Sequence, residues 1–236
     1  MSGQTIVAAS RQRPLARAPD ADCSFCPRLA KYRDSLRAAQ PEWHNAPVQD
    51  FGALDARLLV VGLAPGLRGA NRTGRPFTGD FAGDLLFATL IEFGFAAGAY
   101  GASVDDGLLL AACVITNAVR CVPPQNKPMP SEINSCRPFL AATIAALPDL
   151  RAIVALGRVA HESVVRAFGL KPAAFPFAHG AEHVLVAGET ARHRSRAGAP
   201  AILLADSYHC SRYNTNTGVL TQEMFRAVFA KVRARL

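Results

Sequence analysis

The sequence predicts an α/β protein, a three-layer α/β/α sandwich with a mostly parallel central sheet. Short apolar runs over residues 58–61, 112–116, 152–156 and 201–204 are continuous, which is typical of strands buried on both faces of a parallel sheet. Helix-period segments separate these runs, and such alternation builds a layered α/β fold. Half of the 236 residues are hydrophobic, which is enough for one domain with a substantial core.

The N-terminal part of the chain is predicted to hold one helix between a tail and a linker. Residues 1–20, rich in Arg, Ala and Pro, are expected to form a mobile tail, and residues 21–236 a single domain. Cys23-Ser-Phe-Cys26 opens a predicted helix that ends near residue 39, and residues 40–56 are expected to form a linker.

The remaining elements follow in alternation. Asp80 is a suitable N-cap for a helix over residues 80–93. Prolines over 122–130 predict a loop, after which a helix is expected over 131–147. Further helices are predicted over 158–168 and 221–233, and a short strand over 183–187.

Charge and composition suggest a compartment and a type of partner. The net charge is +8 and the isoelectric point is about 9.6, which favours a polyanion such as nucleic acid, although many basic proteins bind none. No stretch approaches the roughly 18 apolar residues of a membrane span. The first 20 residues lack the apolar core of a signal peptide, so a cytoplasmic protein is expected.

The unusual polar residues gather in three loops, 62–79, 117–130 and 206–218, each of which follows a predicted strand. In a parallel sheet these loops meet at the carboxyl ends of the strands, where ligands bind. The first loop is rich in glycine but contains neither G-x-G-x-x-G nor G-K-[ST], which argues against a nucleotide-binding enzyme.

The six cysteines suggest a metal centre. Cys23 and Cys26 are spaced to share one centre, and Cys121 and Cys136 flank the proline-rich loop. Four thiolates suit either zinc or an iron–sulfur cluster. The spacing lacks the paired C-x-x-C units of a zinc ribbon and therefore favours a [4Fe-4S] cluster. Cys113 lies in an apolar strand and is expected in the core.

Three segments resemble the family 5 uracil-DNA glycosylases (the UdgB type) of the uracil-DNA glycosylase superfamily. The segments are GLAPG with GANRTGRPFTGD over 62–80, TNAVRC with CRP over 116–138, and HCSR with NTNTG over 209–218. The resemblance implies an α/β/α fold, a structural [4Fe-4S] cluster held by the four cysteines, and removal of uracil from DNA in base excision repair. It also implies activity on other deaminated bases such as hypoxanthine.

The residues suit that chemistry. An enzyme that acts on a base in a duplex flips it out and holds it by stacking and by hydrogen bonds. Phe77 offers an aromatic platform, and the resemblance assigns base reading to Asn117. His209 is expected to donate a hydrogen bond to the departing base, which stabilises its developing negative charge.

The attacking water has a less obvious partner. Ala64 stands in the base pocket where other branches of the superfamily carry a carboxylate or asparagine, a departure that family 5 shares. Asn71 is the expected water-positioning residue, and Asp80 is interpreted first as a helix cap. DNA contacts are predicted for a set of loop residues, with Tyr213 entering the duplex beside them. The set comprises Arg72, Arg75, Arg120, Arg212, Asn214 and the basic loop 192–196.

A second class of function remains open at this point. A non-catalytic iron–sulfur module that binds damaged DNA would carry the same cysteines and the same basic charge. Activity on a uracil-containing oligonucleotide discriminates between the two. The glycosylase is expected to be a monomer.

Overall fold

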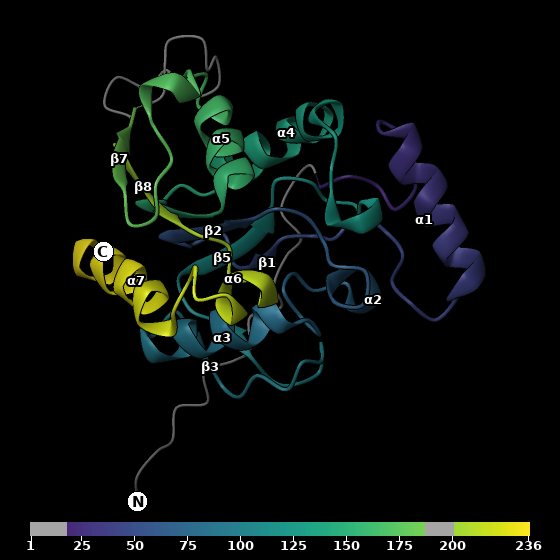
Figure 1. The fold of residues 1–236 in the computed structure, drawn as a ribbon, viewed down its shortest axis with the longest axis horizontal. Helices are drawn as coiled ribbons and strands as arrows, with labels where there is room; N and C mark the ends of the chain where they lie inside the picture. Colours follow the sequence, from purple (N-terminus) through teal and green to yellow (C-terminus); the bar gives the residue numbers. More distant parts are fainter. Residues whose placement is uncertain (1–17, 187–200) are drawn as a thin grey trace, which may run out of the picture.

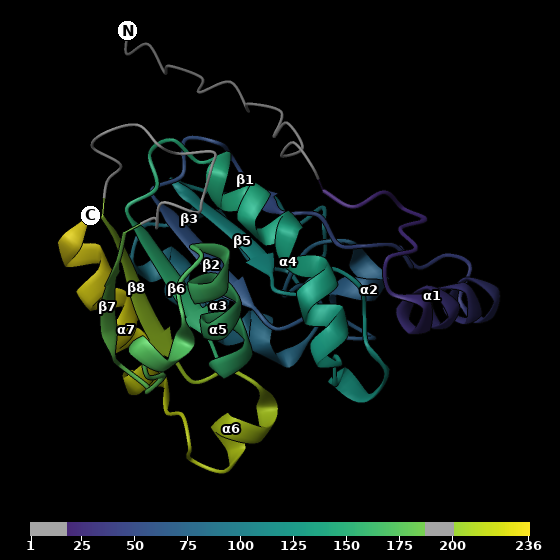
Figure 2. The ribbon, with the colours of Figure 1, turned by 90° about the horizontal axis from the view of Figure 1, so that it is seen from above.

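A computed structural model describes residues 18–186 and 201–236 and contains a six-stranded central sheet. β5, β2, β6 and β8 run parallel, and the edge strands β1 and β7 are antiparallel to their neighbours. The predicted α/β/α fold is thus confirmed (Figures 1 and 2). In spatial order the strands are β1 (Phe51–Gly52), β5 (Cys113–Asn117), β2 (Leu58–Gly62), β6 (Ala152–Leu156), β8 (Ile202–Ser207) and β7 (Glu182–Leu185).

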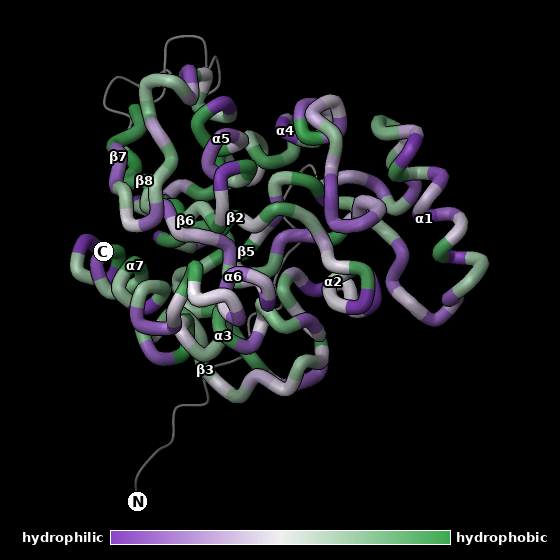
Figure 3. Tube along the Cα trace, in the orientation of Figure 1, coloured by the Kyte–Doolittle hydropathy of each residue, from purple (hydrophilic) through white to green (hydrophobic). Residues whose placement is uncertain are grey.

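Helices cover both faces of the sheet. α3 (Phe81–Glu92) and α7 (Gln222–Arg235) pack on one face, and α4 (Pro130–Ala145) and α5 (Arg158–Ala167) pack on the other. The central strands β2, β5 and β6 are buried along their whole length. Figure 3 shows hydrophobic segments running through the centre of the molecule, where these strands lie.

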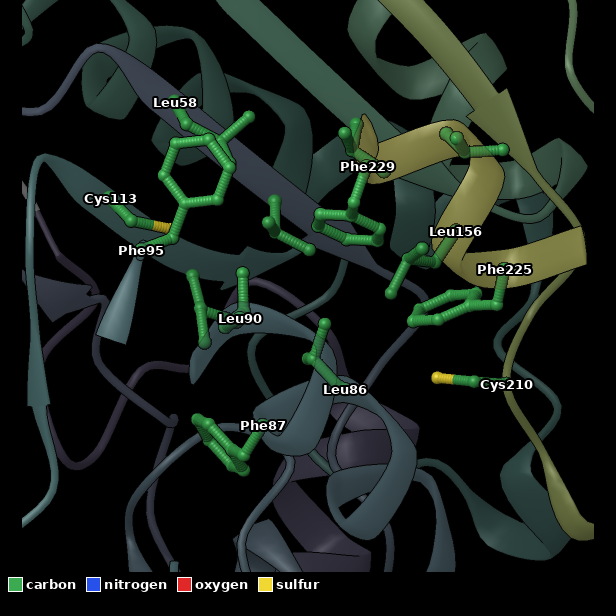
Figure 4. Close-up of a cluster of buried hydrophobic side chains, with 14 of the residues drawn as sticks. Leu58, Leu86, Phe87, Leu90, Phe95, Cys113, Leu156, Cys210, Phe225 and Phe229 are labelled. Atoms are coloured by element: carbon green, nitrogen blue, oxygen red, sulfur yellow. The ribbon is translucent and has the colours of Figure 1, made fainter. Parts of the chain in front are cut away.

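The core under α3 and α7 is rich in aromatic residues (Figure 4). Phe225 and Phe229 are fully buried, and truncating such a side chain to alanine costs about 3–5 kcal/mol. Cys113 and Cys210 lie in the same cluster, so Cys113 is a core residue as predicted. Burial raises the pKa of both thiols far above the usual range, so they remain protonated.

α1 (Pro27–Ala39) lies outside the three layers, at the periphery of Figure 1. It begins directly after Cys26, as predicted, with Pro27 in its first turn. Its buried Leu29 packs with Val119 and Cys136, so α1 is attached to the domain through the predicted metal-binding region.

Several short elements fall in predicted loops. They include β1, β3 (Ala96–Ala97), β4 (Leu109–Leu110), α2 (Ala70–Thr73), α6 (Arg212–Asn216), and the 3-10 turns η1 (Pro124–Asn126) and η2 (Pro172–Ala174). Elements of two to five residues carry no hydrophobic period that a sequence pattern could detect. α4 begins at Pro130, one residue before the predicted start, because proline suits the first helical position.

Parts of three predictions lie outside the described residues. They are most of the N-terminal tail, the basic loop 192–196 and the end of the predicted strand 183–187. Within the described residues no helix has both the length and the apolar character needed to cross a bilayer.

Candidate active site

A cavity of about 610 Å³ lies at the carboxyl ends of the parallel strands, a size typical of small-ligand sites. All three loops that the sequence analysis selected contribute to its wall, so they meet at one edge of the sheet as expected. Its lining includes Leu63, Ala64, Gly66, Arg68, Gly69, Phe77, Asp80, Phe81, Asn117, Asn126, His209, Ser211 and Arg212.

Gly62 allows two site residues to approach the ends of β2 and β5. It is the register partner of Asn117, and a Cβ on Gly62 would lie 2.4 Å from Asn117 Oδ1 and 2.5 Å from Phe77 Cζ. Asn117 is buried, and no side chain or backbone group of the described residues hydrogen-bonds its amide. Its donor and acceptor therefore remain available to a ligand in the cavity.

Phe77 and His209 form an aromatic wall. Their ring centroids are 5.9 Å apart and their planes differ by 23°. Burial lowers the pKa of His209 to about 4, so its imidazole is neutral at physiological pH. Asn214 Nδ2 donates a hydrogen bond of 2.8 Å to the carbonyl of His209, which fixes the loop that carries the imidazole.

Asp80 places a carboxylate in the wall of the cavity. It also caps α3, as predicted, by accepting a hydrogen bond from the backbone N–H of Gly83. A Cβ added to Gly69 would lie only 2.5 Å from Asp80 Oδ2, and a Cβ added to Gly66 would lie 3.0 Å from the same oxygen. Both glycines therefore leave room for the carboxylate. Burial raises the pKa of Asp80, against the opposing effect of hydrogen bonds from Gly83 and Ala82.

Asn71 occupies a different environment from the one predicted. It is 1 % exposed and is not part of the cavity wall. Its Nδ2 donates to Asn45 Oδ1 at 2.9 Å, and Asn45 in turn donates to the carbonyl of Gln40 at 2.7 Å. The contacts fasten the glycine-rich loop to the segment after α1.

The predicted DNA-contacting arginines divide into two groups. Arg72 and Arg212 are exposed, and the guanidinium of Arg212 lies 5.2 Å from the centre of the Phe81 ring. Arg75 is only 6 % exposed and binds both carboxylate oxygens of Asp106, at 2.9 and 2.6 Å. A DNA contact by Arg75 therefore finds no support in this geometry.

Arg120 is likewise committed to the interior. It is 1 % exposed, forms an ion pair with Asp50 and donates to Thr143 Oγ1 at 2.9 Å. The ion pair joins the segment after β5 to the segment before β1, and Thr143 connects both side chains to α4. The expected phosphate contact by Arg120 is wrong, because its guanidinium does not reach the surface.

The four predicted metal ligands, Cys23, Cys26, Cys121 and Cys136, line one small pocket beside α1. None of them forms a disulfide. Burial, reinforced by the neighbouring thiols, raises the pKa of Cys121 to about 12 and that of Cys136 to about 11. The backbone N–H of Arg120 donates to Cys136 Sγ at 3.3 Å.

Some cavity residues were missed by sequence reasoning. Asn126 reaches the cavity from the proline-rich loop and has a φ of +56°, a conformation that asparagine tolerates better than most residues. Arg68, Phe81 and Ser211 also line it. These residues lie in or next to the three loops selected from the sequence. Nothing in the sequence distinguishes them from neighbouring residues that do not line the cavity.

The fold and the site together define a class: an α/β/α protein with a largely apolar cavity, carrying a few polar side chains, at the carboxyl ends of its strands. Residues 49–233 match the family model of the uracil DNA glycosylase superfamily, and the chain belongs to this superfamily. The resemblance inferred from the three motifs is thus confirmed.

Known relatives agree with this assignment. The chain is 44 % identical over 217 residues to a type-5 uracil-DNA glycosylase of Thermus thermophilus, covering 89 % of this chain and 92 % of the relative. It is 36 % identical to a type-5 uracil-DNA glycosylase of Pyrobaculum aerophilum, covering 90 % and 88 % of the two chains. A type-4 uracil-DNA glycosylase of the same archaeon is 32 % identical over 63 % of this chain and 62 % of the relative.

Proposed function

We propose that this protein is a uracil-DNA glycosylase, which hydrolyses the bond between uracil and deoxyribose and leaves an abasic site for base excision repair. One observation supports this proposal most directly: His209, Asn117 and Phe77 line the same cavity in a chain that belongs to this superfamily. A flipped base needs an aromatic surface and hydrogen bonds to its pairing edge, and these residues offer both.

Leaving-group stabilisation is assigned to His209. Negative charge develops on the departing uracil, and an N–H held close to its carbonyl oxygen lowers the energy of that charge. Because burial keeps His209 neutral, it donates a hydrogen bond and does not transfer a proton. The bond from Asn214 to its backbone fixes the donor before the base arrives.

Asp80 is a better-placed partner for the attacking water than Asn71. The Asp80 carboxylate lines the cavity, whereas the side-chain nitrogen of Asn71 already donates to Asn45. The raised pKa of Asp80 makes it a stronger base than an exposed carboxylate. In this assignment Asn71 supports the loop, and Asp80 positions the water.

The DNA surface is proposed to include Arg72, Arg212 and Tyr213. Both arginines are exposed near the cavity, and Tyr213 is 73 % exposed on α6, which projects from the body of the molecule in Figure 2. An aromatic side chain in this position can fill the gap that a flipped base leaves in the stack. The net charge of +8 favours association with the phosphate backbone.

The four-cysteine pocket is proposed to hold a [4Fe-4S] cluster. An all-thiolate ligand set is typical of such clusters. The four cysteines line one pocket, so a single group bound there would contact all four thiols. The positive charge of Arg33 acts to lower the pKa of Cys121, and its Nη1 donates to the Cys23 carbonyl at 2.9 Å, so a cation lies beside the expected anionic cluster.

The cluster would have a structural role, since its ligands come from three separate segments. Cys23 and Cys26 precede α1, Cys121 follows β5, and Cys136 lies in α4. Replacing Cys121 by serine should remove the visible absorbance of thiolate-bound iron, whereas Cys113→Ala should retain it. Stoichiometric zinc in a colourless, anaerobically purified protein would contradict the cluster.

Residues 21–236 are proposed to act as one monomeric, cytoplasmic unit, with hypoxanthine and other deaminated bases as further substrates. Ala64 leaves the pocket without a selective polar group at its position, which fits a broad substrate range. Parallel excision assays with uracil and hypoxanthine opposite each normal base test the range.

The decisive experiment measures alkali-labile abasic sites in a uracil-containing duplex oligonucleotide. The wild type should produce them, and His209→Ala should slow their formation far more than it weakens DNA binding. Tight binding by the wild type with no abasic product would favour the non-catalytic damaged-DNA-binding module.

A further inference from the structure

A second cluster of ligand-type side chains lies apart from the cavity and the cysteines. His161 in α5, His183 in β7 and Asp206 in β8 bring one potential ligand atom each to within 4.8 Å of the others. His161 and Asp206 are buried, and His183 is 14 % exposed at its side chain. None of the three lines the proposed base pocket.

The two contacts of His161 show which of its nitrogens faces the other ligand-type side chains. Its Nε2 lies 2.7 Å from the backbone carbonyl of Phe175. A carbonyl only accepts, so Nε2 carries the proton and donates it. Nδ1 lies 2.7 Å from Asp206 Oδ1, and two acceptor atoms approach this closely only with a second proton or a cation between them. A metal-ligating histidine commonly donates its other N–H to a backbone carbonyl in this way.

A second contact, between Asp206 and His183, distinguishes a bound proton from a larger bound cation. Asp206 Oδ2 and His183 Nε2 are 3.4 Å apart, and both are buried atoms without a hydrogen-bond partner. A proton shared by His161 and Asp206 would satisfy the first contact only. A cation placed between the three side chains would satisfy both contacts, which removes the cost of two unpaired polar atoms.

We propose that His161 Nδ1, His183 Nε2 and the Asp206 carboxylate form a binding site for a divalent transition-metal ion, with Zn²⁺ as the fitting example. Two imidazoles and one carboxylate suit zinc, whereas magnesium and calcium prefer oxygen ligands. Zinc–ligand bonds of about 2.0–2.2 Å place tetrahedral ligand atoms about 3.3 Å apart. His183 Nε2 and Asp206 Oδ2 match this spacing at 3.4 Å, whereas His161 Nδ1 and Asp206 Oδ1, at 2.7 Å, would move apart on binding the ion. The fourth position would take water.

The surroundings of the three side chains suit a bound ion. Phe177 packs against His161 with ring centroids 5.6 Å apart, and Phe175 packs against His183 at 5.8 Å. This aromatic shell limits competition from solvent. His183 lies on the edge strand β7, so its partial exposure provides an entry path.

The ion would have a structural role, because its ligands come from three elements. It would join α5 and the edge strand β7 to the carboxyl end of β8, three residues before His209. The backbone already fastens this point: Gly180 N–H donates to the Asp206 carbonyl at 2.8 Å, and Gly157 N–H to the Ser207 carbonyl at 2.8 Å.

The test uses anaerobically purified full-length protein, with the cysteine site filled, dialysed against ZnCl₂ and then against metal-free buffer. Wild type and a His44→Gln control should retain one zinc per chain, and His183→Gln should retain at least tenfold less. Added ZnCl₂ should raise the melting temperature of wild type but not of His183→Gln. His183→Gln is the decisive variant because its side chain reaches the surface. Zinc retention equal in His183→Gln and wild type, or absent from both, would overturn the site.

Discussion

The carboxylate of Asp80 packs directly on the backbone of Gly69. A Cβ added to Gly69 would lie 2.5 Å from Asp80 Oδ2 and 2.8 Å from Asp80 Cβ. Replacing Gly69 by alanine should therefore displace Asp80 and reduce single-turnover uracil excision by at least tenfold. Gly66→Ala, whose Cβ would contact the same oxygen at 3.0 Å, should cause a smaller loss. Equal, small effects of both variants would argue against a role for Asp80 in the chemical step.

The pH dependence of excision should show that His209 acts as a neutral group. Its pKa is lowered to about 4 by burial, so it should not titrate between pH 6 and 8. Single-turnover rates should thus lack a histidine step with a midpoint near 6.5, the ordinary value. A step at that midpoint that disappears in His209→Asn would show that the imidazole is charged in the active enzyme.

The same shift makes a prediction for stability. The unfolded chain binds a proton at His209 below pH of about 6.5, whereas the folded protein does so only near pH 4. The free energy of unfolding should therefore fall as the pH drops from about 6.5 towards 4. In His209→Asn this part of the decrease should be absent, as measured by urea unfolding at matched pH values.

The ion pair between Arg75 and Asp106 should support the fold and not the binding of DNA. Both side chains are buried, and Arg75 also lies 5.1 Å from the centre of the Phe51 ring. Asp106→Asn leaves the Arg75 charge without its partner and should lower the free energy of unfolding by about 3 kcal/mol at pH 7.

The difference between wild type and Asp106→Asn should shrink at low pH. Hydrogen bonds and charge from Arg75 hold the pKa of Asp106 well below its usual range. The stabilisation is complete above the unfolded pKa of about 3.9 and is lost as the pH falls through the folded value. A constant difference at and below pH of about 4 would show that the carboxylate charge is not involved.

Tyr213 should matter for duplex DNA more than for single strands. It is 73 % exposed, and a duplex leaves a gap that an inserted ring can fill. Tyr213→Ala should reduce uracil excision from a duplex several-fold and leave excision from a single-stranded oligonucleotide nearly unchanged. A similar loss on both substrates would assign Tyr213 to general DNA binding.

The sequence predicted the sheet and the place of the site because both depend on local patterns. Continuous apolar runs identified the buried strands, and loops rich in glycine and asparagine followed them. The sequence did not reveal the contacts made across the fold. Asn71 and Asp80 are nine positions apart in one loop, and only folding directs one to Asn45 and the other into the cavity. The partner of Arg75 lies 31 residues away, beyond the reach of any local pattern.

The small side chain of Ala64 belongs to two neighbourhoods at once. It lines the cavity on one side and packs against the cluster of Leu29, Val119 and Cys136 on the other. The outline of the pocket is therefore set partly by α1, a helix that contributes no residue to the cavity wall. A change that loosens α1 at the periphery should reshape the space available to the base, so the fit of a substrate depends on a helix that never touches it.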